Sequence, residues 1–368
     1  MKITCQKSIL VDAVSNVLRG VSSKSPIPAL EGILLKTEDK ALTLVGYDLE
    51  LGIITSIEAD IEEPGEIVIS ARLLLDIIRK IPSDTIFMST DEKELTVIKG
   101  GAAEFTILGI PASNYPELPV VDESTNLVMK QGVLKSMIDQ TLFAIATTDS
   151  KPVHTGSLFD IGKESITIVS VDGYRLALRR EAFLADQETS FIVPGKTLAE
   201  ISKLLKDEES EVCMVVSHKY IIFKIDGYRV ISRLLEGEFL DYNAAIPKTE
   251  KTTVEVSTRL LTEGIERTSL LISDRLRSPI KLNIADDKIR ISCSTTIGKA
   301  YDEVDCKISG EGVNMGFNNK YLLDALKASD CDMVKLQING ALSPMRVIPP
   351  EGENFLFLVL PVRVKNDD

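Results

Sequence analysis

Three short segments of this chain match one another at a constant spacing of 124 residues. They cover residues 71–79, 195–203 and 319–327, and no gap is needed to superimpose them. In every copy the second residue is a base, the fourth a leucine, the sixth a carboxylate and the ninth a second base. A fixed internal period is typical of an architecture assembled from copies of one unit. Three periods span essentially all of the 368 residues, so the repeat constrains the whole fold.

Each repeat combines two helices with several strands. Apolar residues at helical spacing predict a first helix over 7–21, 131–145 and 257–273, and a second over 71–80, 194–206 and 318–328. Alternating β-branched segments joined by polar turns predict a strand pair after each first helix. These pairs are 32–35 with 42–45, 156–159 with 166–169, and 280–283 with 289–292. The expected fold class is therefore α+β, with three repeated helix-and-sheet domains.

The domain boundaries are expected in two segments with many turn-forming residues. Proline, asparagine and serine concentrate between Pro111 and Pro119, and a second such segment runs over 246–249. We therefore expect an N-terminal domain over 1–122, a central domain over 123–248 and a C-terminal domain over 249–368. Each has an ordinary size for a domain.

The composition is that of a globular chain, with 44% hydrophobic and 26% charged residues. The N-terminus lacks the apolar core of a signal peptide and no run of 18 apolar residues occurs, so we expect a cytoplasmic protein. The cysteines are scattered, without a Cys-x-x-Cys pair, at Cys5, Cys213, Cys293, Cys306 and Cys331. This pattern predicts reduced and mostly buried thiols.

The charge is distributed unevenly between the predicted helices and the rest of the chain. The net charge is −13, which at first argues against an anionic ligand. The six helices nevertheless hold 13 Lys and Arg against 7 Asp and Glu, so the remainder of the chain carries the whole acidic excess. A solvated face explains charge on an amphipathic helix but not a consistent sign. The pattern favours one anionic ligand shared by the helices.

Candidates for catalytic chemistry are few. The only histidines are His154 and His218, which leaves little for metal binding or for activating a nucleophile, and His218 is expected in a surface turn. The segment 195–197 resembles the end of a phosphate-binding loop, but Ser190 stands where that loop requires glycine. No cofactor is expected. The carboxylates Asp76, Glu200 and Asp324 recur in all three copies, which favours a structural role over a single active site.

A closed ring is the geometry that would let basic helices share one large ligand. Helices pack about 10 Å apart, so six helices in a circle would leave a bore of only about 10 Å. Twelve helices would leave about 28 Å, which is enough for duplex DNA and water. Two copies of the chain, joined head to tail, would supply them.

At this point the chain resembles a known family, the bacterial DNA polymerase III beta subunits or beta sliding clamps. The resemblance runs through all three repeats. Its most specific pieces are Ser-Val-Asp-Gly-Tyr-Arg-Leu-Ala at 170–177, Ile-Val-Pro-Gly-Lys at 192–196, Glu-Gly-Glu-Phe-Leu-Asp-Tyr at 236–242 and Leu-Pro-Val-Arg at 360–363. It implies a DNA clamp fold in which two chains form a closed ring around duplex DNA without reading its sequence. The family is a non-catalytic processivity factor that tethers the replicative polymerase, the clamp loader and other proteins.

The resemblance implies a pocket for a short, partly apolar partner peptide between the second and third domains. Its matching residues are His154, Val171, Gly173, Tyr174, Arg175, Leu176, Leu240, Ala244, Ala245, Leu342, Pro344, Met345, Leu358, Leu360, Pro361, Val362 and Arg363. Two positions depart from the family pattern, because Ala244 stands where some members have arginine and Leu240 where proline is frequent. The residues after Val364 extend past the usual end of the motif, and we expect this acidic tail to be disordered.

The resemblance also points to residues for DNA and for the contact between subunits. The DNA candidates are Lys24, Arg72, Arg79, Lys80, Lys135, Thr148, Lys196, Lys203 and Lys320. The candidates for the dimer interface are Phe105 and Ile107 on the first domain, against Leu271 and Ile272 on the third. Pairing of edge strands there would satisfy backbone groups that otherwise invite aggregation.

Two alternatives remain at the level of sequence. The first is an enzyme whose site is assembled from scattered carboxylates at the joints between domains, although such a site would not need the recurrent bases Arg72, Lys196 and Lys320. The second is a scaffold that binds peptides but no DNA. It shares the pocket but gives no reason for basic helices in an acidic chain.

Overall fold

The computed structural model describes residues 1–121, 125–148, 151–206, 209–273 and 278–363. These residues form two compact units, one of 1–134 with 200–234 and the other of 135–199 with 235–368. The expected disorder of the tail from Val364 onwards lies outside the described residues. The strand pairs described below are all antiparallel.

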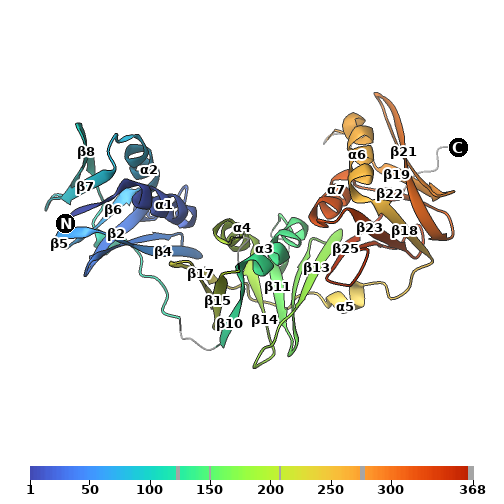
Figure 1. The fold of residues 1–368 in the computed structure, drawn as a ribbon, viewed down its shortest axis with the longest axis horizontal. Helices are drawn as coiled ribbons and strands as arrows, with labels where there is room; N and C mark the ends of the chain where they lie inside the picture. Colours follow the sequence, from blue (N-terminus) through green and yellow to red (C-terminus); the bar gives the residue numbers. More distant parts are fainter. Residues whose placement is uncertain (122–124, 149–150, 207–208, 274–277, 364–368) are drawn as a thin grey trace. The chain divides into compact units, whose positions relative to one another are not determined.

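The first unit contains two sheets (Figure 1). The five-stranded sheet has the order β5-β1-β7-β8-β9, with β1 Lys2–Gln6, β5 Asp60–Glu63, β7 Thr85–Thr90, β8 Leu95–Gly100 and β9 Ala103–Leu108. The eight-stranded sheet has the order β10-β15-β16-β17-β4-β3-β2-β6. Its strands are β2 Gly32–Glu38, β3 Ala41–Tyr47, β4 Leu51–Glu58, β6 Glu66–Ser70, β10 Thr125–Lys130, β15 Glu211–Val216, β16 Tyr220–Ile225 and β17 Tyr228–Arg233.

The second unit contains one twelve-stranded sheet, in the order β14-β11-β12-β13-β25-β24-β23-β18-β21-β20-β19-β22. Its strands are β11 Gly156–Ile161, β12 Ser165–Val171, β13 Arg175–Ala182, β14 Thr189–Pro194, β18 Thr252–Ser257, β19 Ile280–Ala285, β20 Lys288–Thr295, β21 Gly298–Gly310, β22 Val313–Phe317, β23 Met333–Ile338, β24 Met345–Ile348 and β25 Phe355–Val359. The three predicted strand pairs are confirmed as β2–β3, β11–β12 and β19–β20.

The two units do not coincide with the three predicted domains, because the sheets continue from one repeat into the next. Strand β4 of the first repeat pairs with β17 of the second, and β13 of the second pairs with β25 of the third. We call these contacts the first and second joints. Since each joint is a continuous hydrogen-bonded sheet, packing does not separate the repeats, and the boundaries at 122 and 248 stay predictions.

All six predicted helices are present, and they are amphipathic. They are α1 Lys7–Val17, α2 Ala71–Lys80, α3 Gln131–Asp139, α4 Gly195–Leu204, α6 Thr258–Thr268 and α7 Asn319–Ala328. In α2, for example, Leu74 and Ile78 are buried while Arg72 and Arg79 are exposed. Helix α1 packs beside α2, and α6 beside α7 (Figure 1). The segment at 195–197 opens α4, so the structure also confirms that it starts a repeat helix.

The first helix of each repeat is shorter than predicted, because its end tightens into a separate 3₁₀ turn. These turns are η1 Leu18–Gly20, η4 Leu142–Ala144 and η6 Ser269–Leu271. The Thr268 hydroxyl donates to the Gly264 carbonyl at 2.8 Å, and the Thr141 hydroxyl donates to that of Met137 at 2.8 Å. Hydroxyls that bond to the preceding turn compete with continued α-helix.

Several short elements were not predicted from the sequence. They are helix α5 Tyr242–Ala245 and the 3₁₀ turns η2 Pro28–Glu31, η3 Ala112–Asn114 and η5 Pro152–Thr155. The five cysteines are free, with Cys5 and Cys293 buried and the others half-buried, as expected. His218 is exposed between β15 and β16, which also agrees with the expectation.

Candidate sites for a partner peptide, DNA and a second subunit

The turn between β12 and β13 forms the centre of the predicted peptide site. The Asp172 carboxylate accepts the backbone N–H groups of Tyr174 and Arg175 at 2.9 and 3.0 Å. Gly173 has φ of +91°, a conformation that residues with a side chain rarely adopt. This tight turn holds the Tyr174 side chain out from the sheet, with 61% of its surface exposed.

Arg175 is held in place by contacts on every side. Its Nε donates to Asp172 at 2.9 Å, and its guanidinium forms an ion pair with Asp324 of α7. The guanidinium also lies over the ring of Tyr321, 4.5 Å from its centroid, and over that of Phe143 at 5.5 Å. Arg175 therefore ties β13 to α7, and its predicted role at the peptide site is to position its neighbours.

Tyr321 and Asp324 belong to this site although they were not predicted there from the sequence. The Tyr321 ring lies parallel to that of Tyr174, with centroids 6.0 Å apart. A signal was present in the repeat, because the positions equivalent to Tyr321 carry a leucine in the first copy, Leu73, and a threonine in the second, Thr197. An aromatic residue in one copy alone marks a contact that the other copies do not make.

The predicted peptide residues divide into a buried floor and an exposed rim. Val171, Leu176 and Leu358 are buried in one apolar cluster. The exposed rim consists of Tyr174, Leu240, Ala244, Ala245, Leu342, Leu360, Val362 and Arg363, and Pro344 and Pro361 are half-buried. Met345 was predicted to line the pocket, but its exposed surface is 0% because it points into the core of the third repeat. It supports the surface from beneath and does not line it.

His154 contributes an uncharged ring to this region. Its ring meets that of Phe239 edge-on, with centroids 5.5 Å apart. Burial lowers the pKa of His154, and nearby Lys151 lowers it further. The usual value is about 6.5, so the imidazole is neutral at pH 7 and suits an apolar ligand.

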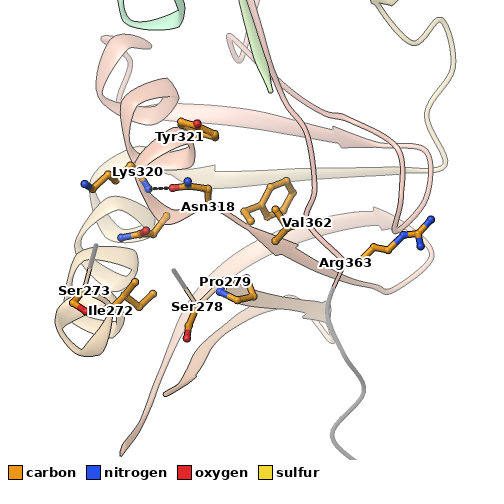
Figure 2. Close-up of a pocket in the computed structure, with 11 residues that line it drawn as sticks. Ile272, Ser273, Ser278, Pro279, Asn318, Lys320, Tyr321, Val362 and Arg363 are labelled. Atoms are coloured by element: carbon orange, nitrogen blue, oxygen red, sulfur yellow. Dashed lines mark hydrogen bonds between the residues drawn. The ribbon is translucent and has the colours of Figure 1, made fainter. Parts of the chain in front are cut away.

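A cavity of about 750 Å³ lies at the end of the rim nearest the C-terminus (Figure 2). Val362 and Arg363 line it together with Tyr321 and Asn318 at the start of α7. The Val362 N–H donates to the Gly316 carbonyl at 2.8 Å, which fixes the C-terminal segment against β22. The same cavity is lined by Lys320, predicted to bind DNA, and by Ile272, predicted at the dimer interface. The structure thus brings together residues that the sequence assigned to three different sites.

The predicted DNA residues lie on the solvent-facing sides of their elements. Arg72, Arg79, Lys80, Lys196, Lys203 and Lys320 are exposed on repeat helices, Lys24 and Thr148 are exposed outside them, and Lys135 is half-buried. Arg79 donates to the Ser15 hydroxyl at 3.2 Å, and Lys203 pairs with Glu200 at 2.8 Å. Surface pairs of this kind hold their charges only weakly.

The repeated carboxylates at two of the three positions serve the joints, in agreement with the structural role expected from the sequence. At the first joint Glu200 pairs with Arg19 of the preceding repeat at 3.2 Å. At the second joint Asp324 pairs with Arg175 of the preceding repeat. The remaining copy of this carboxylate, Asp76, is exposed on α2.

The predicted dimer residues lie near unpaired strand edges. Phe105 and Ile107 belong to β9, the last strand of the five-stranded sheet, and Phe105 is exposed. Leu271 and Ile272, at the end of η6, are half-buried. Their neighbour Leu270 was not singled out from the sequence, yet 81% of its surface is exposed.

The described residues offer neither a membrane span nor a metal site. No helix among them is both long and apolar enough to cross a membrane. No group of three His, Cys, Asp or Glu side chains within the described ranges could hold a metal ion.

Comparison with known proteins matches the chain from end to end. Models of the N-terminal, central and C-terminal domains of the DNA polymerase III beta subunit match residues 1–119, 128–241 and 243–363. The beta sliding clamp of Bacillus subtilis is 35% identical over 99% of this chain and 100% of its own length. That of Staphylococcus aureus is 31% identical over 99% of both chains.

Solved structures give the same result. The DNA polymerase sliding clamp of Bacillus subtilis superimposes with a TM-score of 0.95 at 34% identity, covering 99% of this chain and 100% of that one. A DNA polymerase III beta subunit from Eubacterium rectale gives 0.94 at 32% identity, covering 98% and 99%. Both the threefold repeat and the sequence identity extend over the full length, so the chain belongs to the DNA polymerase III beta subunit family, the beta sliding clamps.

Proposed function

We propose that this chain is a cytoplasmic sliding clamp that encircles duplex DNA as a head-to-tail homodimer and tethers the replicative polymerase, the clamp loader and other DNA-processing proteins. Membership of the family makes it a processivity factor and not an enzyme. The observation that carries the proposal is the pair of internal joints, because both are built in the same way and each end of the chain offers half of a third.

Each joint uses the same two kinds of strand. One is the strand that follows the second strand of the predicted pair, β4 or β13, and the other is the last strand of a three-strand meander, β17 or β25. The third repeat carries the counterpart of β4 in the first half of β21, and the first repeat carries the counterpart of β17 in β9. Within the described residues, neither has a strand partner on that side. A second copy placed head to tail would supply both.

The first joint predicts the register of this third joint. There Ile53 lies opposite Val230 and Leu51 opposite Ser232. The strand pairs β3–β4 and β20–β21 equate Ile53 with Ala300, and the pairs β16–β17 and β8–β9 equate Val230 with Phe105. Phe105 should therefore lie opposite Ala300 of the second copy. Val230 is buried at the first joint whereas Phe105 is exposed, as expected for a residue that awaits its partner.

The second joint supports the same arrangement. Phe143 of η4 packs edge-on against Phe357, with ring centroids 5.3 Å apart, and Phe357 lies opposite Ala177, the counterpart of Ala300. The residue of η6 that corresponds to Phe143 is the exposed Leu270. We therefore expect Leu270 to contact Phe105 of the second copy, beside Leu271 and Ile272.

Binding around DNA needs only charge and closure. Lysine and arginine on the helices would attract phosphates without reading bases, which permits sliding. The acidic remainder of the chain would discourage binding of DNA outside the ring.

The test of this function is retention on circular DNA. The chain, loaded by a clamp loader onto a nicked circular plasmid, is expected to stay bound through gel filtration in moderate salt. Linearising the plasmid should release it, because the ring can then slide off an end. Equal retention on both forms would contradict encirclement, since direct contacts do not depend on DNA ends.

Charge reversal at the repeated bases should weaken the attraction to DNA. In Arg72→Glu with Lys196→Glu and Lys320→Glu, the slope of log K against log salt should fall by about 0.9 for each phosphate that is no longer neutralised. Fluorescence titration of duplex DNA across several salt concentrations would measure it. A matched control reverses Lys93, Lys163 and Lys219, which are exposed in turns outside the helices. The helices do not face DNA if both triple variants give the same slope.

A further inference from the structure

The first two repeats contain the same apolar cluster at the same spacing of 124 residues. In the first repeat its members include Leu34, Val45, Tyr47, Ile54, Tyr115 and Leu118, and in the second Leu158, Val169, Val171, Leu178, Phe239 and Tyr242. The second cluster forms the floor of the predicted peptide surface. The first repeat should therefore hold a related surface, and the structure shows that the chain itself covers it.

The cover is the segment 115–121, which follows η3. Tyr115 is only 7% exposed, and its hydroxyl donates to the Val45 carbonyl at 3.2 Å. Burial raises the pKa of Tyr115 well above its usual value, so the hydroxyl stays protonated and keeps this bond. Tyr115 thus acts as one anchor of the segment in the cluster.

The second anchor, Leu118, packs into a space that the first repeat alone provides. It lies over Gly52, where an added Cβ would come within 2.9 Å of the Leu118 Cδ2. The equivalent residue of the second repeat is Leu176, which fills this space itself. Its counterpart of Leu118, Tyr242, instead donates its hydroxyl to Asp160 at 2.7 Å. The glycine and Leu118 therefore form a fitted pair that the second repeat lacks.

The third anchor carries the segment across the first joint. Val121 packs against Val215, Ile222 and Ile231 of the second repeat and against Ile54 of the first. The cluster of the second repeat crosses the second joint in the same way, through Leu356 and Leu358 of β25. Both surfaces thus lie over a joint between repeats.

We propose that residues 115–121 are the built-in occupant of a second peptide groove, related by the repeat to the partner site and closed by the chain itself. The groove would take the same class of ligand, a short peptide with an aromatic and an aliphatic anchor. This inference rests on the peptide-tethering role proposed above for the second repeat. It explains why each chain offers one partner site although it contains two related surfaces.

Tethering explains why the groove stays closed. A segment joined to its own groove by a short linker acts at an effective concentration in the millimolar range. A free peptide with the same anchors must displace it, which weakens the apparent affinity of that peptide by about tenfold or more. Removing the anchors from the resident segment should remove this competition.

The test supplies the segment in trans. The variant Tyr115→Ser with Leu118→Ser and Val121→Ser, in the full-length chain, is titrated with a fluorescent peptide of residues 112–121. We expect one site per chain, with an affinity at least about tenfold above that of the unaltered chain. A peptide with the same three serines should not bind. Absence of binding to the folded variant, or equal binding to the unaltered chain, overturns the proposal.

Competition identifies the groove that is occupied. A polymerase-derived clamp-binding peptide, added in excess, should leave the trans peptide bound. Displacement would mean that the trans peptide occupies the partner site, and the proposal would be wrong. The unaltered chain is titrated with the polymerase peptide in parallel, because its failure to bind would contradict the proposed function and not this inference.

A second variant keeps the linker sequence intact. Gly52→Leu gives the first repeat the residue that the second carries, so it should expel Leu118 from its space. Cleavage of the linker by thermolysin near Leu118 is expected to become at least about tenfold faster, because an open state then dominates. The matched control Gly162→Leu alters a glycine whose added Cβ has room beside Ser165. Unchanged cleavage in a folded Gly52→Leu chain would show that Leu118 is not seated over Gly52.

Discussion

A chain that combines Leu271→Ala with Ile272→Ala is expected to sediment as a monomer, whereas the unaltered chain sediments as a dimer. Both side chains are half-buried in the single chain and should be fully buried against Phe105 and Ile107 of a second copy. Truncating a buried leucine or isoleucine to alanine costs about 2–5 kcal/mol. The ring contains two identical joints, so the dimer should weaken by well over about a thousandfold. Sedimentation velocity at micromolar concentration would measure this.

The structure supplies a control and an additional variant for this experiment. Leu184→Ala alters a leucine that is 86% exposed and lies outside every predicted contact, so it should leave the dimer unchanged. Leu270→Ser should weaken the dimer by itself, because its counterpart Phe143 packs at the second joint. A dimer that persists in the double variant, with circular dichroism unchanged, would remove this joint from the proposal.

Cysteine cross-linking tests the register of the same joint. Thr106 and Lys299 correspond to Ile231 and Gly52, which lie opposite each other at the first joint. Thr106→Cys with Lys299→Cys should therefore form a disulfide between chains under mild oxidation. Thr106→Cys with Ala300→Cys should not, because a shift of one residue turns the side chain to the other face. The reverse outcome would show that the register is shifted by one residue.

Removal of residues 360–368 is expected to abolish binding of partner peptides while the dimer persists. The deletion takes away the exposed Leu360 and Val362, and with them the bonds from their N–H groups to the carbonyls of Tyr174 and Gly316, at 2.9 and 2.8 Å. Strand β25 ends at Val359 and stays complete. Removal of several anchors should cost well over about 2 kcal/mol, or about thirtyfold in affinity. Fluorescence anisotropy with a polymerase-derived peptide would measure it, and primer extension should show reduced processivity.

A shorter deletion is the matched control for this experiment. Removing only residues 364–368 takes away the acidic end but none of the predicted pocket residues, so peptide affinity should be retained. If the longer deletion unfolds the third repeat, Leu360→Ser with Val362→Ser replaces it, because both side chains are exposed. Wild-type affinity in the folded longer deletion, or in this double variant, would contradict the pocket assignment.

The sequence by itself determined the repeated unit and its local elements. Apolar spacing predicts all six repeat helices, and alternation predicts the strand pairs 32–35 with 42–45 and their two copies, all of which the structure contains. These predictions succeed because they depend on the burial of one face of a helix or strand, a property of residues close together in the chain. The recurrence of Glu200 and Asp324 similarly indicated a structural role before their arginine partners were known.

Only the tertiary structure decided which strands join the repeats and which side chains reach the surface. The pairing of β4 with β17 links residues about 180 positions apart, and no local pattern specifies such a partner. Burial of Met345, the clamp of Tyr321 and Asp324 on Arg175, and the seat of Leu118 over Gly52 all depend on these pairings. The repeat gives every copy the same backbone plan, but each site depends on the few positions where the copies differ, and packing alone shows what those residues contact.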